Sequence, residues 1–467
     1  MFDKSNQGAS LGQDTAPQKP ATLLQKTAWG IADFPIASYS IIKNMVIMAF
    51  LVSILKIPPG IAGTMIFLII IFDVISDPIV GWLSDRTLSR FGRRLPWGFF
   101  GALVLAFGLW GVFSPPESLF GIKAALYSFG FAIVATWGYT MVTVPMNAML
   151  SEITQDRDER SRFTAFRMSF SALGILAAGG IFPLLAGTTR AEHSFAALIF
   201  GILFIIMIWM MVAGCLSLPR VLTQDTTPVL KSFTHVIKQR NFMAFVGYYA
   251  IQNYATAILT AGIPFATSYL ILNQTPSLFS SLASDTGVQT ILFSFFVLGV
   301  LFSQPLWSLL SQRYGKLRMM LISSLGYCVT LVLFFFLIPA TNVTPVFITA
   351  IVLGLCNGGF LHMPWAFLPD IVAEIKERTK VEVDGMFNSF WSLGQKLANA
   401  FGPLTLGWII QFNGWVQADP LSQEIPSQPE SVLTVLAVTM TLLPALIMLL
   451  SVIYLHLILR YKVLKTY

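Results

Sequence analysis

Charged residues are scarce in this sequence. Asp, Glu, Lys and Arg make up 11% of its 467 residues, whereas a soluble globular protein carries about 25%. Hydrophobic residues reach 55%, and the mean hydropathy is +0.72. This composition excludes an ordinary soluble domain and predicts an integral membrane protein.

Cysteine and histidine are also rare. The three cysteines lie in or beside apolar segments without a CxxC pair, which is typical of small buried side chains. The four histidines show no metal-ligand spacing. The sequence contains neither the HExxH motif of zinc proteases nor the GxxxxGK[ST] loop of ATP-driven pumps. We therefore expect neither an enzyme nor a bound cofactor.

Long apolar stretches recur along the chain. A helix needs about 20 mostly apolar residues to cross a bilayer. Twelve segments meet this requirement: 28–53, 60–83, 96–114, 121–150, 162–187, 195–216, 241–272, 287–311, 318–339, 344–369, 384–412 and 431–459. The sequence therefore predicts an all-α membrane protein with twelve transmembrane helices.

Basic residues predict the orientation in the membrane. Of the 29 Lys and Arg residues, 23 lie in the tails and in the loops after even-numbered segments. The opposite loops hold only Lys56, Lys123 and Arg190. By the positive-inside rule both termini are cytoplasmic. Residues 1–24 are polar and lack the apolar core of a signal peptide, so we expect a disordered tail. The dispersed net charge of +7 reflects this topology and does not indicate nucleic-acid binding.

The longest polar stretch between segments, 217–240, divides the chain into six plus six helices. This predicts an N-terminal bundle over 25–216, a C-terminal bundle over 241–460 and a cytoplasmic tail over 461–467. Each half also carries a short basic loop with a glycine after its second helix. Two parallel six-helix repeats with a long central loop resemble the plan of the major facilitator superfamily.

Asp73 and Asp77 lie inside the apolar segment 60–83. Residues four apart share one helix face. A carboxylate in hydrocarbon costs roughly 2.5–3.5 kcal/mol on insertion scales. The pair is therefore expected to face a polar cavity, a cation or a counter-charge, which indicates ion-coupled transport.

An acidic and basic loop follows the same segment. Asp85 near the helix end can pair with Arg86, Arg93 or Arg94, and such a latch would favour one access state. These four residues are our candidate gating residues. The alternative is that the arginines only anchor the loop on the cytoplasmic side.

The stretch 73–97, DVISDPIVGWLSDRTLSRFGRRLPW, resembles the glycoside–pentoside–hexuronide:cation symporters. Further matching stretches lie at 139–154, 156–168 and 368–372, and the resemblance covers about 26–460. It implies a monomeric symporter of the bacterial inner membrane that works by alternating access. Its partners would be the bilayer, a small organic solute and a coupling cation, Na⁺ or H⁺.

The resemblance places the cation site on helices II and IV. The matching positions are Asp73, Ser76, Asp77 and Thr140. The residue types agree, because Na⁺ and other hard cations prefer carboxylate and hydroxyl oxygens. The alternative for each aspartate is a structural salt bridge.

This chain has different residues at the positions where the family's melibiose carrier binds its sugar. Ala37 and Thr143 replace two acids that hold sugar hydroxyls, and Asn147 replaces the aromatic ring that stacks on the sugar. These three positions remain candidate substrate contacts, but the galactoside grip is absent. Asp33, one turn before Ala37, is either a replacement or an interfacial acid.

Four further residues are candidate substrate contacts. Lys396 matches the family's helix XI lysine. Either a cation displaces it from the carboxylates, or it forms a permanent salt bridge between the halves. Arg167 matches the helix V arginine and would either bind substrate or reach the interface. Trp391 would stack on a sugar ring or pack against lipid. Lys43 would either compensate the acids or bind an anionic substrate, which leaves a lysolipid or other amphipathic anion as the alternative class.

Overall fold

The computed structural model describes residues 21–154, 156–216, 234–271, 285–338, 344–379, 384–417 and 426–460. Within these ranges the regular structure is helical and contains no strand. Most of the N-terminal tail and the central loop expected from the sequence, and the whole C-terminal tail, lie outside the described residues.

The N-terminal half contains six spans, of which the first and the fifth are interrupted by π-helical turns. Its elements are α1 (Leu23–Gly30), α2 (Asp33–Ile41), η1 (Ile42–Val46), α3 (Ile47–Ala49), η2 (Phe50–Ile54), α4 (Pro59–Asp85), α5 (Leu95–Val112), α6 (Gly121–Ile153), α7 (Arg157–Leu176), η3 (Ala177–Ile181), α8 (Phe182–Ala186) and α9 (Arg190–Cys215).

The C-terminal half repeats this number of spans. Its described elements include α11 (Arg240–Ala266), η4 (Thr267–Ile271), α12 (Asp285–Tyr314), α13 (Lys316–Leu337), α14 (Thr344–Thr379), α15 (Asp384–Phe412), α16 (Glu430–Met440) and α17 (Leu442–Arg460).

The predicted twelve-helix membrane fold is confirmed. Eleven helical segments of the described chain are long and apolar enough to span a membrane. The twelfth is α15, whose polar residues lower its hydropathy although it packs between α4 and α11. The largest boundary difference from expectation is in α14, which continues past residue 369 to Thr379, because a helix that leaves the bilayer can keep its hydrogen bonds in polar surroundings.

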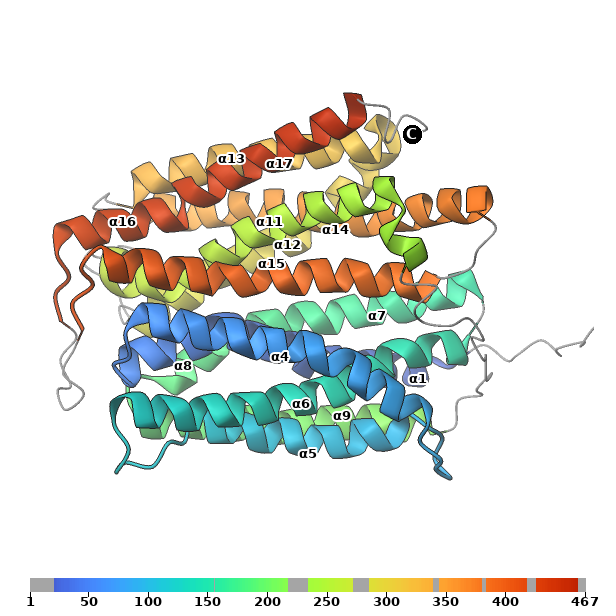
Figure 1. Cartoon of the computed structure of the whole chain (residues 1–467), viewed down its shortest axis with the longest axis horizontal. Coiled ribbons are helices and arrows are strands. Elements are labelled where there is room, and N and C mark those ends of the chain that lie inside the picture. Colours follow the sequence, from blue (N-terminus) through green and yellow to red (C-terminus); the bar gives the residue numbers. More distant parts are fainter. Residues whose placement is uncertain are drawn as a thin grey trace, which may run out of the picture.

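The two halves lie side by side, with α4 and α15 adjacent at their interface (Figure 1). The start of α1 and the end of α17 lie at the same end of the bundle (Figure 1). Pro78 lies inside α4, where it cannot donate a backbone hydrogen bond and so weakens the turn that carries Asp77.

Hydrogen bonds join the halves where α4 begins and α15 ends. The Gly60 amide donates to Gln411 Oε1 at 2.8 Å, and Trp408 Nε1 donates to Thr64 Oγ1 at 3.0 Å. At the same end Thr290 Oγ1 of α12 donates to a carbonyl in η3 at 2.8 Å. We call this end of the interface the closed end.

Two glycines permit the close approach of α4 and α15 at the closed end. A Cβ on Gly63 would overlap the carbonyl oxygen of Pro403, and a Cβ on Gly407 would overlap that of Pro59. Because both obstacles are backbone atoms, a side chain at either position must separate the helices.

Gly407→Val should therefore open the closed end. Overpacking of this kind costs about 1–3 kcal/mol, so we expect a several-fold faster reaction of a thiol probe with Thr64→Cys in purified protein lacking the three native cysteines. The control is Gly130→Val, because a Cβ on Gly130 meets no atom within 4 Å. Equal labelling rates in the two variants would contradict the proposed contact.

Candidate cation and substrate site

Asp73 is the centre of a buried charge cluster. Its side chain is 1% exposed. Its Oδ2 accepts a hydrogen bond from Lys43 Nζ at 2.7 Å. Its Oδ1 accepts from Lys396 Nζ at 3.1 Å and from Thr140 Oγ1 at 3.2 Å. Both carboxylate oxygens of Asp73 therefore already have donors.

Asp77, one turn further along α4, shares the same lysine. Lys396 Nζ donates to Asp77 Oδ2 at 2.6 Å. The Asp77 side chain is 30% exposed, but its Oδ1 is buried and has no hydrogen-bond partner among the described residues. Lys396 belongs to α15, so a single ammonium group joins both acids of the N-terminal half to the C-terminal half.

The hydroxyl groups expected at the cation site lie beside Asp73. Ser76 Oγ and Thr140 Oγ1 are 2.9 Å apart, and Ser76 Oγ also donates to the Asp73 carbonyl oxygen at 3.0 Å. The structure thus brings Asp73, Ser76 and Thr140 into direct contact and connects Asp77 to them through Lys396.

Two tyrosines that were not among the candidates from the sequence complete the cluster. The Tyr139 ring centroid is 4.9 Å from Lys43 Nζ and 6.0 Å from Lys396 Nζ. The Tyr39 ring lies 5.8 Å from Lys43 Nζ. Ring faces attract ammonium groups at such distances. The available signal was the position of Tyr139 directly before Thr140 on α6.

Arg167 forms a separate ion pair. Its Nε lies 2.5 Å from Asp33 Oδ2, and its guanidinium group lies 5.8 Å from the Trp29 ring. Asp33 is thus paired with Arg167, so it is not available to replace the sugar-binding acid of the melibiose carrier, and it is not part of the Asp73 cluster. The Arg167 side chain remains 24% exposed, so it can still meet a solute.

The other candidate substrate contacts are dispersed. Ala37 is half-buried, Thr143 is buried and Asn147 is exposed. Trp391 lies in the core of the C-terminal half, where its ring stacks on Tyr249 at 4.1 Å. A neighbouring phenylalanine and a tryptophan cover it further. In this conformation the Trp391 ring is fully buried, so it offers no face to a solute and does not pack against lipid as the alternative had it.

The candidate gating residues pair within the N-terminal half. Arg94 Nη2 lies 3.3 Å from Asp85 Oδ1 and 3.0 Å from Glu152 Oε1. Arg93 also pairs with Glu152, whereas Arg86 lies over the Trp82 ring at 4.1 Å. Glu152, at the end of α6, was also not among the candidates from the sequence, although it pairs with both arginines.

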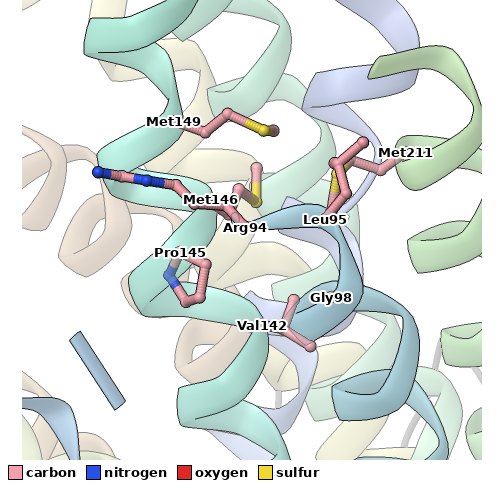
Figure 2. Close-up of a pocket in the computed structure, with 8 residues that line it drawn as sticks. All are labelled: Arg94, Leu95, Gly98, Val142, Pro145, Met146, Met149 and Met211. Atoms are coloured by element: carbon pink, nitrogen blue, oxygen red, sulfur yellow. The ribbon is translucent and has the colours of Figure 1, made fainter. Parts of the chain in front are cut away.

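A small, largely apolar pocket lies beside this arginine cluster, between α5, α6 and α9 (Figure 2). Its lining residues are Arg94, Leu95, Gly98, Val142, Pro145, Met146, Met149 and Met211. None of the buried acids and lysines of the Asp73 cluster lines it, so this pocket is separate from the candidate cation site.

Comparison with known proteins matches the whole membrane region. The family model described as MFS/sugar transport protein matches residues 28–463. The inner membrane symporter YicJ of Escherichia coli is 26% identical, over 92% of this chain and 90% of that protein. The mouse sphingosine-1-phosphate transporter MFSD2B is 27% identical, over 83% of this chain and 81% of that protein.

Solved structures share the fold. The nucleoside transporter NupG superimposes with a TM-score of 0.66 at 13% sequence identity, covering 94% of this chain and all of that chain. At this identity the likeness concerns the architecture alone.

Asp73→Ala should be strongly destabilising, because it leaves the Lys43 ammonium buried without its acid. Removing one partner of a buried pair costs roughly 3–5 kcal/mol. The double variant Asp73→Ala with Lys43→Met removes both charges, so it should unfold at a higher temperature than Asp73→Ala alone.

The measurement is a double-mutant cycle on thermal unfolding of the detergent-solubilised protein. Asp370→Ala is the control, because its pair with Lys316 is 39% and 37% exposed and exposed pairs contribute about 0–1 kcal/mol. Strictly additive effects of Asp73→Ala and Lys43→Met would contradict the coupling.

Proposed function

The chain belongs to the MFS/sugar transport protein family, and from this premise we propose a cation-coupled symporter that moves a small organic solute across the inner membrane. The coupling ion is Na⁺ or H⁺. The observation that carries the proposal is the Lys396 ammonium, 2.6 Å from Asp77 and 3.1 Å from Asp73. A carboxylate pair held by a charge from the opposite half can exchange that charge for an ion.

The exchange supplies a mechanism. An ion that binds at Asp73 or Asp77 competes with Lys396 for the carboxylates. Once Lys396 leaves, the halves lose a charged contact and can change their relative position. By reciprocal linkage, a solute that prefers the rearranged cavity raises the affinity for the ion by the same factor.

The closed end fits the alternating-access part of the proposal. With the termini in the cytoplasm, as the basic loops favour, the contacts of Gly60 and Trp408 lie on the outer side. The ion pairs of Arg93, Arg94 and Glu152 lie on the inner side. In this account they stabilise the inner ends of α4, α5 and α6 as one unit while the halves move.

For the solute we propose a glycoside, pentoside, hexuronide or related compound. Arg167, with its partly exposed guanidinium, is the proposed polar contact, and Ala37, Thr143 and Asn147 are proposed lining residues. The acids and the aromatic ring that grip a galactoside are absent, so we exclude galactosides from the proposal.

An amphipathic anion is the second candidate substrate. Ala37 and Thr143 give the cavity fewer hydrogen-bonding acids, and MFSD2B is named for the transport of a lipid phosphate. Lys43 does not serve such a substrate in this conformation, because Asp73 already pairs with it. Uptake assays with radiolabelled hexuronides, neutral glycosides and lysolipids distinguish the candidates.

Asp77→Asn should abolish concentrative uptake by proteoliposomes. The amide keeps the size of the side chain but can neither carry the charge that attracts the ion nor pair with Lys396 as an acid. Exchange of labelled for unlabelled solute should survive, because it requires no net ion movement.

Uptake is measured under an imposed Na⁺ gradient and, separately, a pH gradient. Glu117→Gln is the matched control, since this acid lies exposed in the loop between α5 and α6. Concentrative uptake by Asp77→Asn at the wild-type level would refute the assignment of the acid pair.

A further inference from the structure

We propose that the ammonium group of Lys43 is a tethered substitute for an inorganic cation and excludes Na⁺ from the acid pair. The inference rests on the proposed function, since it concerns which ion the pair can exchange. It makes Lys43 a specificity-determining residue for the coupling ion.

Lys43 withholds one carboxylate oxygen of the acid pair from a metal ion. Sodium and other hard cations need several oxygen ligands at once. Lys43 takes Asp73 Oδ2 at 2.7 Å, while Lys396 and Thr140 take Asp73 Oδ1. The buried carboxylate oxygen that remains without a donor among the described residues of this cluster is Asp77 Oδ1. An ion that replaces Lys396 would also gain Asp77 Oδ2 and Asp73 Oδ1, but Asp73 Oδ2 and one of the two negative charges stay with Lys43.

The two lysines differ in whether they can leave. Lys396 belongs to the opposite half and is 22% exposed, so movement of the halves can take it away from both acids. Lys43 belongs to the same half as Asp73, and its side chain is 4% exposed. When the halves separate, Lys43 therefore stays with Asp73.

The surroundings of Lys43 are built to retain a cation. The rings of Tyr39 and Tyr139 lie 5.8 Å and 4.9 Å from its Nζ. Asp73 is its ion-pair partner among the described residues, and Lys396 and Asp77 are the other charged groups that interact with it. Lys43 also lies in the π-helical turn η1, a backbone distortion that is frequent at functional sites.

The charges lead to the same conclusion. Lys43 and Lys396 balance Asp73 and Asp77, and after Lys396 withdraws, the remaining group of Lys43, Asp73 and Asp77 has one net negative charge. Lys43 has then already neutralised one acid. Within the proposed function, the ion that remains able to drive transport is the proton, which needs only one oxygen atom.

Lys43→Met should convert this cluster into a sodium site. The substitution frees Asp73 Oδ2 and leaves Asp73, Asp77 and Lys396 with one net negative charge. Asp73 and Asp77, with the nearby hydroxyl groups of Thr140 and Ser76, then provide the mixed oxygen set that Na⁺ prefers.

The test is the melting temperature of the purified full-length protein in NaCl and in choline chloride at equal ionic strength. The wild type should show no Na⁺-specific shift. Lys43→Met should gain a saturable rise of several degrees in NaCl, because a ligand that binds only the folded state stabilises it. Adding Asp73→Asn to Lys43→Met should remove the rise.

Lys26→Met is the matched control. Lys26 is another buried lysine paired with an acid, Glu159, at 3.5 Å, but it lies outside the cluster. Its removal should create no Na⁺ response, so a response in Lys43→Met cannot be a general effect of losing a buried lysine.

Two results would overturn the proposal. One is a saturable, Na⁺-specific rise in the wild type that Asp73→Asn abolishes, and the other is a folded Lys43→Met variant without any Na⁺ response. The wild-type arm needs no lysine substitution, so it decides the matter if Lys43→Met does not fold. Failure of the proposed function would appear in a different measurement, the uptake assay, as concentrative uptake that Asp77→Asn leaves intact.

Discussion

The bridge from Lys396 to Asp73 and Asp77 is a charged contact between the two six-helix halves. Charges buried in a membrane protein must be compensated, and here part of the compensation comes from the opposite six-helix half. Stability and movement are thereby linked, because the contact that neutralises the acids also holds the halves together. An ion that replaces Lys396 can keep the acids neutralised while it releases the halves.

The other contacts described above lie at the two ends of the molecule, on either side of this bridge. At the closed end Gly63 and Gly407 allow α4 and α15 to touch through their backbones. At the other end Glu152 forms ion pairs with Arg93 and Arg94, all within one half. Contacts within a half leave that half free to move as a unit, whereas contacts between halves must break, and the described ion pairs between the halves are those of Lys396.

The sequence was sufficient to predict the twelve helices and to select Asp73, Asp77 and Lys396 as candidates, because charges in apolar segments stand out. It could not predict the pairing. Lys43, Arg167 and Lys396 were three bases for three acids, and only the packing of η1, α7 and α15 against α4 and α2 assigns Lys43 to Asp73 and Arg167 to Asp33. The sequence also could not show whether Tyr139 and Trp391 face the site or the core, since an aromatic residue on a helix can do either.

The central claim is that Lys396 holds the halves together. The most direct measurement is the distance distribution between spin labels at Phe120→Cys and Phe412→Cys, two exposed positions in opposite halves at the closed end. We expect one dominant short distance in the otherwise wild-type protein and a second, longer population in Lys396→Met. An unchanged distribution in a folded Lys396→Met variant would contradict it.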